Sequence, residues 1–479
     1  MSRCLTGALA ALSLCAAAPA AAAEPSAALL EEAAALRDLA LAHSDAFEFV
    51  RSLTTEVGPR FAGSSGDRAA VGWALATLPG IGFDDIRPQA VTVPAWERGQ
   101  AEVRITQPFP QTLVAVSLGL SIGTPEEGIE APVIRFESLA ALEAARPSTV
   151  RGHIVFIDER MERTRDGSGY SPAVQKRVHG PSVASQRGAV AIVIRSVGTS
   201  GERVAHTGTT RYADGVRPIP AFALAGPDAD ILANQLATGR DVSLRVYSSA
   251  RMLPPARSAN VIADIRGADR PDEIVILAAH LDSWDVGPGA HDNATGVAIL
   301  MEVARHIGLQ ARRPSRTVRV VLYANEEAGL DGSHAYTAAA LESGERHVVG
   351  IEADAGAGLI FRFNSGVGEA ALPVIDAMRR VLAPLGIEGG DNSATGGADL
   401  STLRAAGMPV LAMQHDMTRY FDLHHTANDT LDKVDPEALR QAVAAFASVV
   451  WIAANVAGDF GRFPGAPPPP PADPAESSD

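Results

Sequence analysis

Histidine and carboxylate side chains follow several short apolar runs in the second half of the sequence. They are His280, Asp282, Asp292, Glu326, Glu327, Asp354, His424 and His425. Imidazole nitrogens and carboxylate oxygens are ligands that suit zinc. Two histidines and three carboxylates can bind two divalent ions when one carboxylate bridges them. The combination therefore indicates a metal site at which hydrolytic chemistry is possible.

Each of these residues also has a simpler explanation when it is taken alone. His280 and Asp282 project to one side of an extended chain, which fits a hydrogen-bonded surface pair as well as a metal ligand with its carboxylate partner. Asp292 is placed to cap the helix that follows it. The adjacent acids Glu326 and Glu327 repel each other unless a cation, a proton or solvent separates them. The combination, rather than any single residue, favours a metal site.

The apolar runs that precede these side chains have the lengths and compositions of strands. The runs lie at 274–279, 318–323, 348–352 and 410–413, and helical patterns such as 295–307 alternate with them. This alternation is typical of an α/β fold with a mostly parallel central sheet flanked by helices. Ligands bind at the carboxyl ends of parallel strands. We therefore expect the polar side chains to meet at that edge of the sheet.

The composition is that of a folded globular protein. The chain has 479 residues, of which 46% are hydrophobic and 20% are charged, and these values exclude a disordered, collagen-like or coiled-coil chain. Its length predicts two or three lobes. The 41 Lys and Arg residues against 56 Asp and Glu residues give a formal net charge of −15. A negative chain repels phosphate backbones and anionic lipid, so nucleic acid is a poor candidate partner.

Residues 1–23 are predicted to be a signal peptide. A basic residue, an apolar run and three alanines at 21–23 precede Glu24, where cleavage is expected. Both cysteines of the sequence, Cys4 and Cys15, fall in this segment, so the mature chain is expected to contain neither a disulfide nor a reactive thiol. No later segment is predicted to span a membrane. We therefore expect a secreted or periplasmic protein.

The mature chain is predicted to be a catalytic domain that is interrupted by an inserted domain. The catalytic domain takes residues 24–129 and 251–462, and the inserted domain takes residues 130–250. Strand and helix patterns of its own set the inserted block apart, and they fit a lid or substrate-positioning module as well as a spacer. Residues 463–479 are rich in proline and are expected to form a flexible tail.

Five short strings match a known family in their order along the chain. They are HLDSWD (280–285), GAHDNATG (289–296), NEEAGLDGS (325–333), EADAG (352–356) and HHTANDT (424–430). The chain resembles the co-catalytic zinc exopeptidases of the aminopeptidase and glutamate carboxypeptidase type. The likeness to the glutamate carboxypeptidase branch covers nearly the whole mature chain, and it implies that the inserted block is similar to a protease-associated domain.

The resemblance implies a set of ligands for two zinc ions. His280 and Asp354 would bind one ion. Glu327 and His425 would bind the other, and Asp292 would bridge the two. His425 is assigned, rather than the histidine before it, because the family's ligand directly precedes the Thr or Ser of this motif.

The resemblance also implies roles for residues that do not bind metal. Glu326 would be the base that takes a proton from the attacking water, and Asp282 would support His280 from behind. His424 occupies a position from which some relatives steady the tetrahedral intermediate. The family often has a cis peptide after its bridging acid, here between Asp292 and the next residue.

These roles imply an exopeptidase that hydrolyses short peptides or dipeptides. Relatives of this branch can act as aminopeptidases or dipeptidases despite a carboxypeptidase name, so the end of the peptide that is attacked stays open. Two other classes fit the same scaffold, namely a non-catalytic binding protein and a glutaminyl cyclase with a single zinc ion. The complete ligand set disfavours both. The resemblance also suggests a homodimer.

Overall fold

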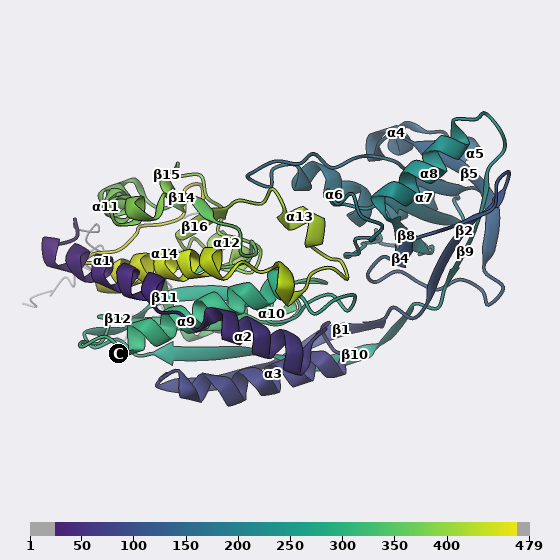
Figure 1. Cartoon of the computed structure of the whole chain (residues 1–479). Helices are drawn as coiled ribbons and strands as arrows, with labels where there is room; N and C mark the ends of the chain where they lie inside the picture. Colours follow the sequence, from purple (N-terminus) through teal and green to yellow (C-terminus); the bar gives the residue numbers. More distant parts are fainter. Residues whose placement is uncertain (1–23, 467–479) are drawn as a thin grey trace, which may run out of the picture.

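A computed structural model describes residues 24–466, and Figure 1 shows two lobes, each built around its own sheet. The predicted signal peptide, with both cysteines, and residues 467–479 of the predicted tail lie outside the described residues. The start of that tail belongs to the fold, because Phe463 packs against a buried apolar cluster of the larger lobe.

The larger lobe contains an eight-stranded sheet. In spatial order its strands are β1 (Asp85–Glu97), β10 (Arg251–Ile265), β12 (Arg316–Tyr323), β11 (Arg270–His280), β13 (Arg346–Glu352), β16 (Val410–His415), β14 (Ile360–Gly366) and β15 (Glu388–Gly389). The four central strands β12, β11, β13 and β16 run parallel. The pairs β1–β10, β10–β12 and β14–β16 are antiparallel. The sheet is therefore mixed, with parallel strands at its centre.

Helices cover both faces of this sheet. Successive side chains of a strand point to opposite faces, and in β11 Leu277 and Ala278 accordingly join different buried clusters. The cluster on one face includes helices α1 (Ala27–Ala42), α2 (Ala46–Ser52), α3 (Ser65–Thr77), α9 (Thr295–Gly308), α11 (Leu372–Leu382) and α14 (Pro436–Asn455). The other face is covered by α10 (Asp331–Ser343) and α12 (Ser401–Ala405). The lobe is thus a three-layer α/β/α structure.

Helix α14 has a length and composition that the sequence analysis overlooked. Among the described residues it is the helix that is long and apolar enough to cross a membrane by those criteria, yet 89% of its most apolar window is buried inside the fold. It contacts α1, α9 and β12. A helix that is apolar on all sides is expected in the core of a large lobe, so the burial explains the composition.

The smaller lobe contains a second eight-stranded sheet. In spatial order its strands are β3 (Gln111–Leu113), β2 (Ala101–Gln107), β9 (Ser243–Ser248), β5 (Ile129–Phe136), β6 (Ile154–Ile157), β7 (Ala191–Arg195), β8 (Ala221–Leu224) and β4 (Ala115–Ser117). Its helices are α4 (Leu139–Ala144), α5 (Pro147–Val150), α6 (Tyr170–Val178), α7 (Gly180–Gln186) and α8 (Gly226–Leu236). The boundary predicted at residue 130 falls inside this sheet, because β2, β3 and β4 belong to it. Strand patterns do not show which sheet a strand joins.

Strands β1 and β10 connect the two lobes (Figure 1). They pair antiparallel, and Glu97 lies opposite Arg251 where the chain passes into the smaller lobe and returns from it. Short helical segments complete the fold at η1 (Leu53–Val57), η2 (Leu78–Gly80), η3 (Ala290–Ala294), η4 (Glu369–Ala371), η5 (Ala383–Leu385), α13 (Tyr420–Leu423) and η6 (Leu431–Lys433). Helix α13 lies between the lobes (Figure 1).

Candidate active site

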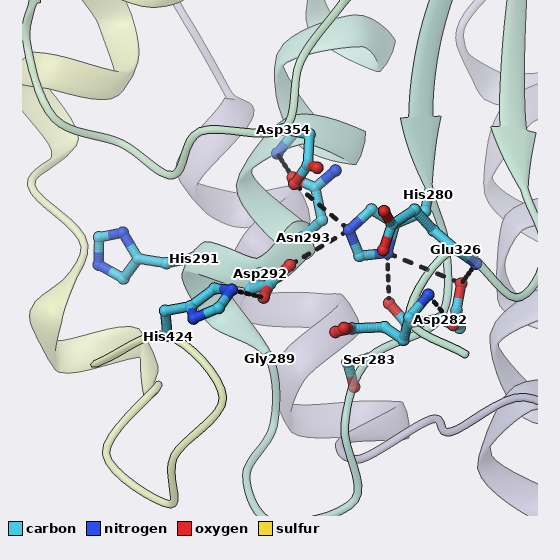
Figure 2. A network of polar contacts seen from close by, with 12 residues as sticks. His280, Asp282, Ser283, Gly289, His291, Asp292, Asn293, Glu326, Asp354 and His424 are labelled. Carbon is cyan, nitrogen blue, oxygen red and sulfur yellow. Dashed lines mark hydrogen bonds and ion pairs between the residues drawn. The ribbon is translucent and has the colours of Figure 1, made fainter. Parts of the chain in front are cut away.

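The polar side chains predicted from the sequence meet at the carboxyl ends of the central parallel strands (Figure 2). β11 ends at His280, and the loops after β12 and β13 carry Glu327 and Asp354. Asp292 lies in η3, and His425 follows α13. This convergence is the one expected from parallel topology, because all the strands involved present the same end to one edge of the sheet.

One group of donor atoms forms around His280. Its Nε2 lies 3.2 Å from Asp292 Oδ1 and 3.3 Å from Asp354 Oδ1. This nitrogen is buried and has no hydrogen-bond partner among the described residues. Two ligands at about 2.0–2.2 Å from a tetrahedral zinc ion lie about 3.3–3.6 Å apart. The three atoms are therefore spaced as ligands of one ion are.

A second group of donor atoms forms around His425. Its Nε2 lies 3.3 Å from Asp292 Oδ2 and 3.0 Å from Glu327 Oε2. The other oxygen of Glu327 is buried and lacks a hydrogen-bond partner within residues 24–466. Asp292 presents one oxygen to each group, as a bridging carboxylate does. The residues present thus fit the pair of zinc ions that the resemblance implies.

Burial and like charge act together on the acids of the site. Burial raises the pKa of Glu327 to about 7, and the neighbouring carboxylate of Asp292 acts in the same direction. Burial also raises the pKa of Glu326 well above its usual range. Burial opposes ionisation of Asp292, but the nearby imidazoles of His280 and His425 outweigh it and hold the pKa of Asp292 well below its usual range. Positive charge in their midst would stabilise all three carboxylates.

Asp282 contacts both His280 and the loop that carries Glu326. Its Oδ1 lies 3.7 Å from His280 Nδ1, on the side where a supporting carboxylate was predicted, and its backbone carbonyl is closer, at 3.0 Å. The carboxylate accepts hydrogen bonds from the backbone N–H groups of Glu326 and Glu327, at 3.1 and 3.4 Å. Because a carbonyl only accepts, Nδ1 of His280 carries the proton and Nε2 is left free to bind a cation.

His424 lies beside the second group without matching the contacts of His425. Its Nε2 is 3.6 Å from Asp292 Oδ2, and its ring stacks on that of His425 with the centroids 3.6 Å apart. Burial lowers the pKa of His424 well below its ordinary value, and the adjacent His425 acts in the same direction. His424 is therefore a neutral imidazole next to the shared carboxylate.

Asp429 is a site residue to which the sequence analysis assigned no role. Its carboxylate accepts hydrogen bonds from the backbone N–H groups of His291 and Asp292, at 2.6 and 3.0 Å. Burial raises its pKa to about 7. The peptide bond between Asp292 and Asn293 is cis, as the resemblance implies. The one sequence signal for Asp429 was its place in the string HHTANDT. No local pattern reveals its partners, because they lie 138 and 137 residues away along the chain.

Arg60 was also missed, and it shapes the loop that leads to Asp292. The side chain is fully buried and donates to the backbone carbonyls of Leu281, Pro288 and Gly289, at 2.6, 2.6 and 3.0 Å. A single guanidinium thereby holds both ends of the loop between β11 and η3. No sequence pattern indicates this role, because the partners of Arg60 are main-chain atoms that any sequence would supply.

Comparison with known proteins decides the family. The model of peptidase family M28 matches residues 260–450 of the chain. Carboxypeptidase Q of Homo sapiens is 32% identical over 415 residues, which cover 87% of this chain and 86% of that protein. The chain belongs to peptidase family M28. The likeness predicted from the five sequence strings, including the branch that contains carboxypeptidase Q, is thereby confirmed.

Solved structures agree with membership of family M28. A peptidase M28 precursor from Shewanella amazonensis has a TM-score of 0.89 and 44% sequence identity, and the match covers 92% of this chain and 99% of that one. A zinc aminopeptidase from Bacillus subtilis has a TM-score of 0.62 at 19% identity, with 86% and 94% of the two chains covered. The second likeness shows that the fold is shared.

Proposed function

We propose that this member of family M28 is a dizinc exopeptidase that hydrolyses short peptides or dipeptides. One observation carries the proposal, namely that Asp292 presents one oxygen to His280 and the other to His425. Each histidine also faces a carboxylate of its own, Asp354 or Glu327. Two ions that share one carboxylate require a donor set of this kind. The names of relatives, carboxypeptidase Q and zinc aminopeptidase, support the same reaction class.

The proposed chemistry assigns different tasks to the residues around the donor atoms. Zinc ions bound there would lower the pKa of water towards about 7 and polarise the peptide carbonyl. Glu326 would take the proton from the attacking water and pass it to the leaving amine. Its backbone is held by the carboxylate of Asp282, which limits how far the base can move. His424 would donate a hydrogen bond to the oxyanion of the tetrahedral intermediate.

Metal analysis and peptide assays test this proposal on the full mature chain. We expect two zinc equivalents per chain after reconstitution, together with hydrolysis of dipeptides from a library. One zinc equivalent with cyclisation of N-terminal glutamine would instead support a glutaminyl cyclase. A chain that binds no zinc and hydrolyses nothing would support a binding protein.

Blocked substrates test which end of the peptide must be free. Loss of hydrolysis on acetylation of the amino terminus indicates an aminopeptidase, and loss on amidation of the carboxyl terminus indicates a carboxypeptidase. Loss in both cases indicates a dipeptidase. The same preparation, measured by light scattering, tests the predicted homodimer.

We also propose that the smaller lobe is similar to a protease-associated domain and that the chain is exported. The predicted signal peptide supports export, and so does the word precursor in the name of the Shewanella amazonensis relative. Sequencing the amino terminus of the protein from its native host tests this, because export with cleavage at the predicted position leaves Glu24 as the first residue.

A further inference from the structure

Two residues of the smaller lobe contact His425 of the larger lobe. They are Thr207, in the loop between β7 and β8, and Arg177 of α6, whose Nη1 lies 3.3 Å from His425 Nδ1. The backbone N–H of Thr207 donates to the carbonyl of His425 at 3.0 Å, and the carbonyl of Thr207 lies 3.2 Å from His425 Nδ1. Next to it, His206 Nδ1 donates to the carbonyl of His424 at 2.8 Å. Two successive residues of the smaller lobe thus hydrogen-bond to two successive histidines of the larger lobe.

The contact with Thr207 determines which nitrogen of His425 is available to a metal. Its Nε2 faces the carboxylate oxygens of Asp292 and Glu327. A carbonyl only accepts a hydrogen bond, so Nδ1 must carry the proton if it bonds to Thr207, and Nε2 then keeps its lone pair. Arg177 Nη1 also lies 3.3 Å from Nδ1 but can only donate, and the carbonyl of Thr207, 3.3 Å from Nη1, accepts from it in that arrangement. Such a bond behind a metal-binding histidine orients the ring and fixes its tautomer.

The same contact holds a backbone conformation that is costly by itself. His425 has a φ of 62°, in the left-handed region that residues other than glycine rarely adopt. A residue stays there only when its surroundings hold it. The two hydrogen bonds with Thr207 bind both the main chain and the ring of His425, so they supply part of that restraint.

Arg177 of α6 braces Thr207 in turn. This side chain is only 5% exposed, and its Nη1 donates to the carbonyl of Thr207 at 3.3 Å while its Nη2 donates to the hydroxyl of Tyr170 at 2.9 Å. Arg98 adds a hydrogen bond from its Nη1 to Thr207 Oγ1 at 2.8 Å. Thr207 is therefore held by two arginines in addition to its contacts with His425.

His280, at the centre of the other group of donor atoms, is oriented differently. Its Nδ1 bonds to the carbonyl of Asp282, which lies two residues further along the same loop of the larger lobe. The two carboxylates that face its Nε2, Asp292 and Asp354, also belong to the larger lobe. One half of the site thus depends on a single lobe, and the other half depends on both.

We propose that the smaller lobe completes the half of the metal centre around His425, with Arg177 as a positioning residue that contacts both Thr207 and the imidazole of His425. The half around His280 needs the larger lobe alone. The inference rests on the proposed dizinc function, and it gives the smaller lobe a part in metal binding. Displacing Thr207 should release one zinc ion and leave the other bound.

Zinc titration of Arg177→Met tests this proposal, with a chelating dye as competitor to report the two affinities separately. We expect one of the two affinities to match the wild type and the other to fall about 10- to 100-fold, as for other groups that orient a ligand. Arg177→Lys retains a charged donor and should give an intermediate loss. The unchanged affinity also shows that the variant is folded.

Arg163→Met is the matched control. Arg163 also bridges the lobes, since it donates to Asp422 at 2.6 Å and to the carbonyl of Thr199 at 2.8 Å, but these contacts do not involve Thr207 or His425. Both zinc affinities of this variant should equal those of the wild type. If it loses affinity for one ion as Arg177→Met does, general separation of the lobes explains the loss and the proposal is wrong.

Equal losses at both positions in Arg177→Met, or no loss at either, would also overturn the proposal. If that variant does not fold, Gly208→Ala takes its place, because a Cβ on Gly208 would lie 2.3 Å from Arg177 Cζ and would displace the guanidinium. A wild-type chain that binds fewer than two zinc ions contradicts the proposed function itself. Two ions in the wild type with normal affinities in both variants contradicts only the role of the smaller lobe.

Discussion

The two sheets of the molecule both carry charged residues at the carboxyl ends of parallel strands, but they use them in opposite ways. In the larger lobe β11 ends at His280, whose Nε2 is buried without a hydrogen-bond partner among the described residues. In the smaller lobe β6 is followed by Asp158 and β7 ends at Arg195, and Arg195 Nε donates to Asp158 Oδ1 at 2.7 Å. Charge at a strand end therefore follows from the topology, and what distinguishes the candidate metal site is a strand-end histidine whose buried nitrogen faces carboxylates without a hydrogen bond.

The largest effect is expected when Asp292, the acid that faces both histidines at the edge of the larger lobe's sheet, is replaced. Asp292→Ala should lower the affinity for both zinc ions by more than about 100-fold, because replacing groups that only hydrogen-bond to a ligand already costs about 10- to 100-fold in affinity. Hydrolysis should become undetectable. Metal analysis after dialysis and a dipeptide assay measure both. Asp158→Ala, at the corresponding edge of the second sheet, should keep two zinc ions. Loss of zinc from that control would remove the distinction between the two sheets.

A change next to the ligands should separate catalysis from binding. Glu326→Gln should keep both zinc ions and lower kcat by about 10²- to 10⁴-fold, because the amide cannot accept the proton of the attacking water. Glu159→Gln alters an acid that follows a strand of the second sheet and should leave kcat unchanged. Stopped-flow assays at saturating dipeptide give kcat for both variants. A Glu326→Gln enzyme with normal kcat would rule out Glu326 as the base.

The ion pair of the second sheet should affect stability rather than metal binding. Arg195→Met removes the buried partner of Asp158, which keeps Arg135 as a second partner. The cost in the free energy of unfolding should therefore exceed that of an exposed pair but stay below about 3–5 kcal/mol, the cost of a buried charge left without any partner. Arg160→Met removes an exposed partner of Asp230 and should cost less than about 1 kcal/mol. Urea unfolding followed by circular dichroism measures both. Zinc content should equal that of the wild type. A loss of zinc would show that this edge of the smaller lobe's sheet is coupled to the candidate metal site of the larger lobe.

The smallest effect concerns a histidine at a strand end that is not a ligand candidate. His415 ends β16, its Nδ1 donates to the carbonyl of Gly358 at 2.9 Å, and burial lowers its pKa to about 4. The unfolded chain binds a proton near pH 6.5, so His415 costs no stability above that pH and destabilises the fold as the pH falls from 6.5 towards 4. Between pH 7.5 and 5.5 this amounts to about 1 kcal/mol.

His415→Gln should reduce the loss of stability between pH 7.5 and 5.5 by that amount, while zinc binding stays as in the wild type. Urea unfolding at a series of pH values provides the measurement. A variant with the slope of the wild type would show that the fold does not lower the pKa of His415.

Local patterns were sufficient to predict the elements that carry the candidate ligands. The apolar run at 274–279 lies within β11 and the run at 410–413 lies within β16, because strands buried on both faces are continuously apolar. The helical stripe at 295–307 matches α9 within one residue. Once these strands were taken as parallel, one topological rule placed His280 and Asp354 at the same edge.

Features that depend on distant partners could not be predicted. The break between α1 and α2 depends on contacts with α9, where Glu302 accepts a hydrogen bond from the backbone N–H of Asp45 and His306 Nε2 meets the carbonyl of His43. The carboxylate of Asp282 binds backbone N–H groups more than forty residues away. Thr207 has no unusual residue type or spacing. Its importance appears only when the two lobes are seen together.

The pairing of Glu97 with Arg251 has a consequence for how such an architecture can arise. The chain leaves the host sheet and returns to it at neighbouring positions, so a tight turn between these two residues would join β1 to β10 as an ordinary hairpin. Insertions whose ends lie close together are readily tolerated. The topology therefore permits a peptidase that lacks the whole smaller lobe. In such a protein another group would have to orient the imidazole that corresponds to His425.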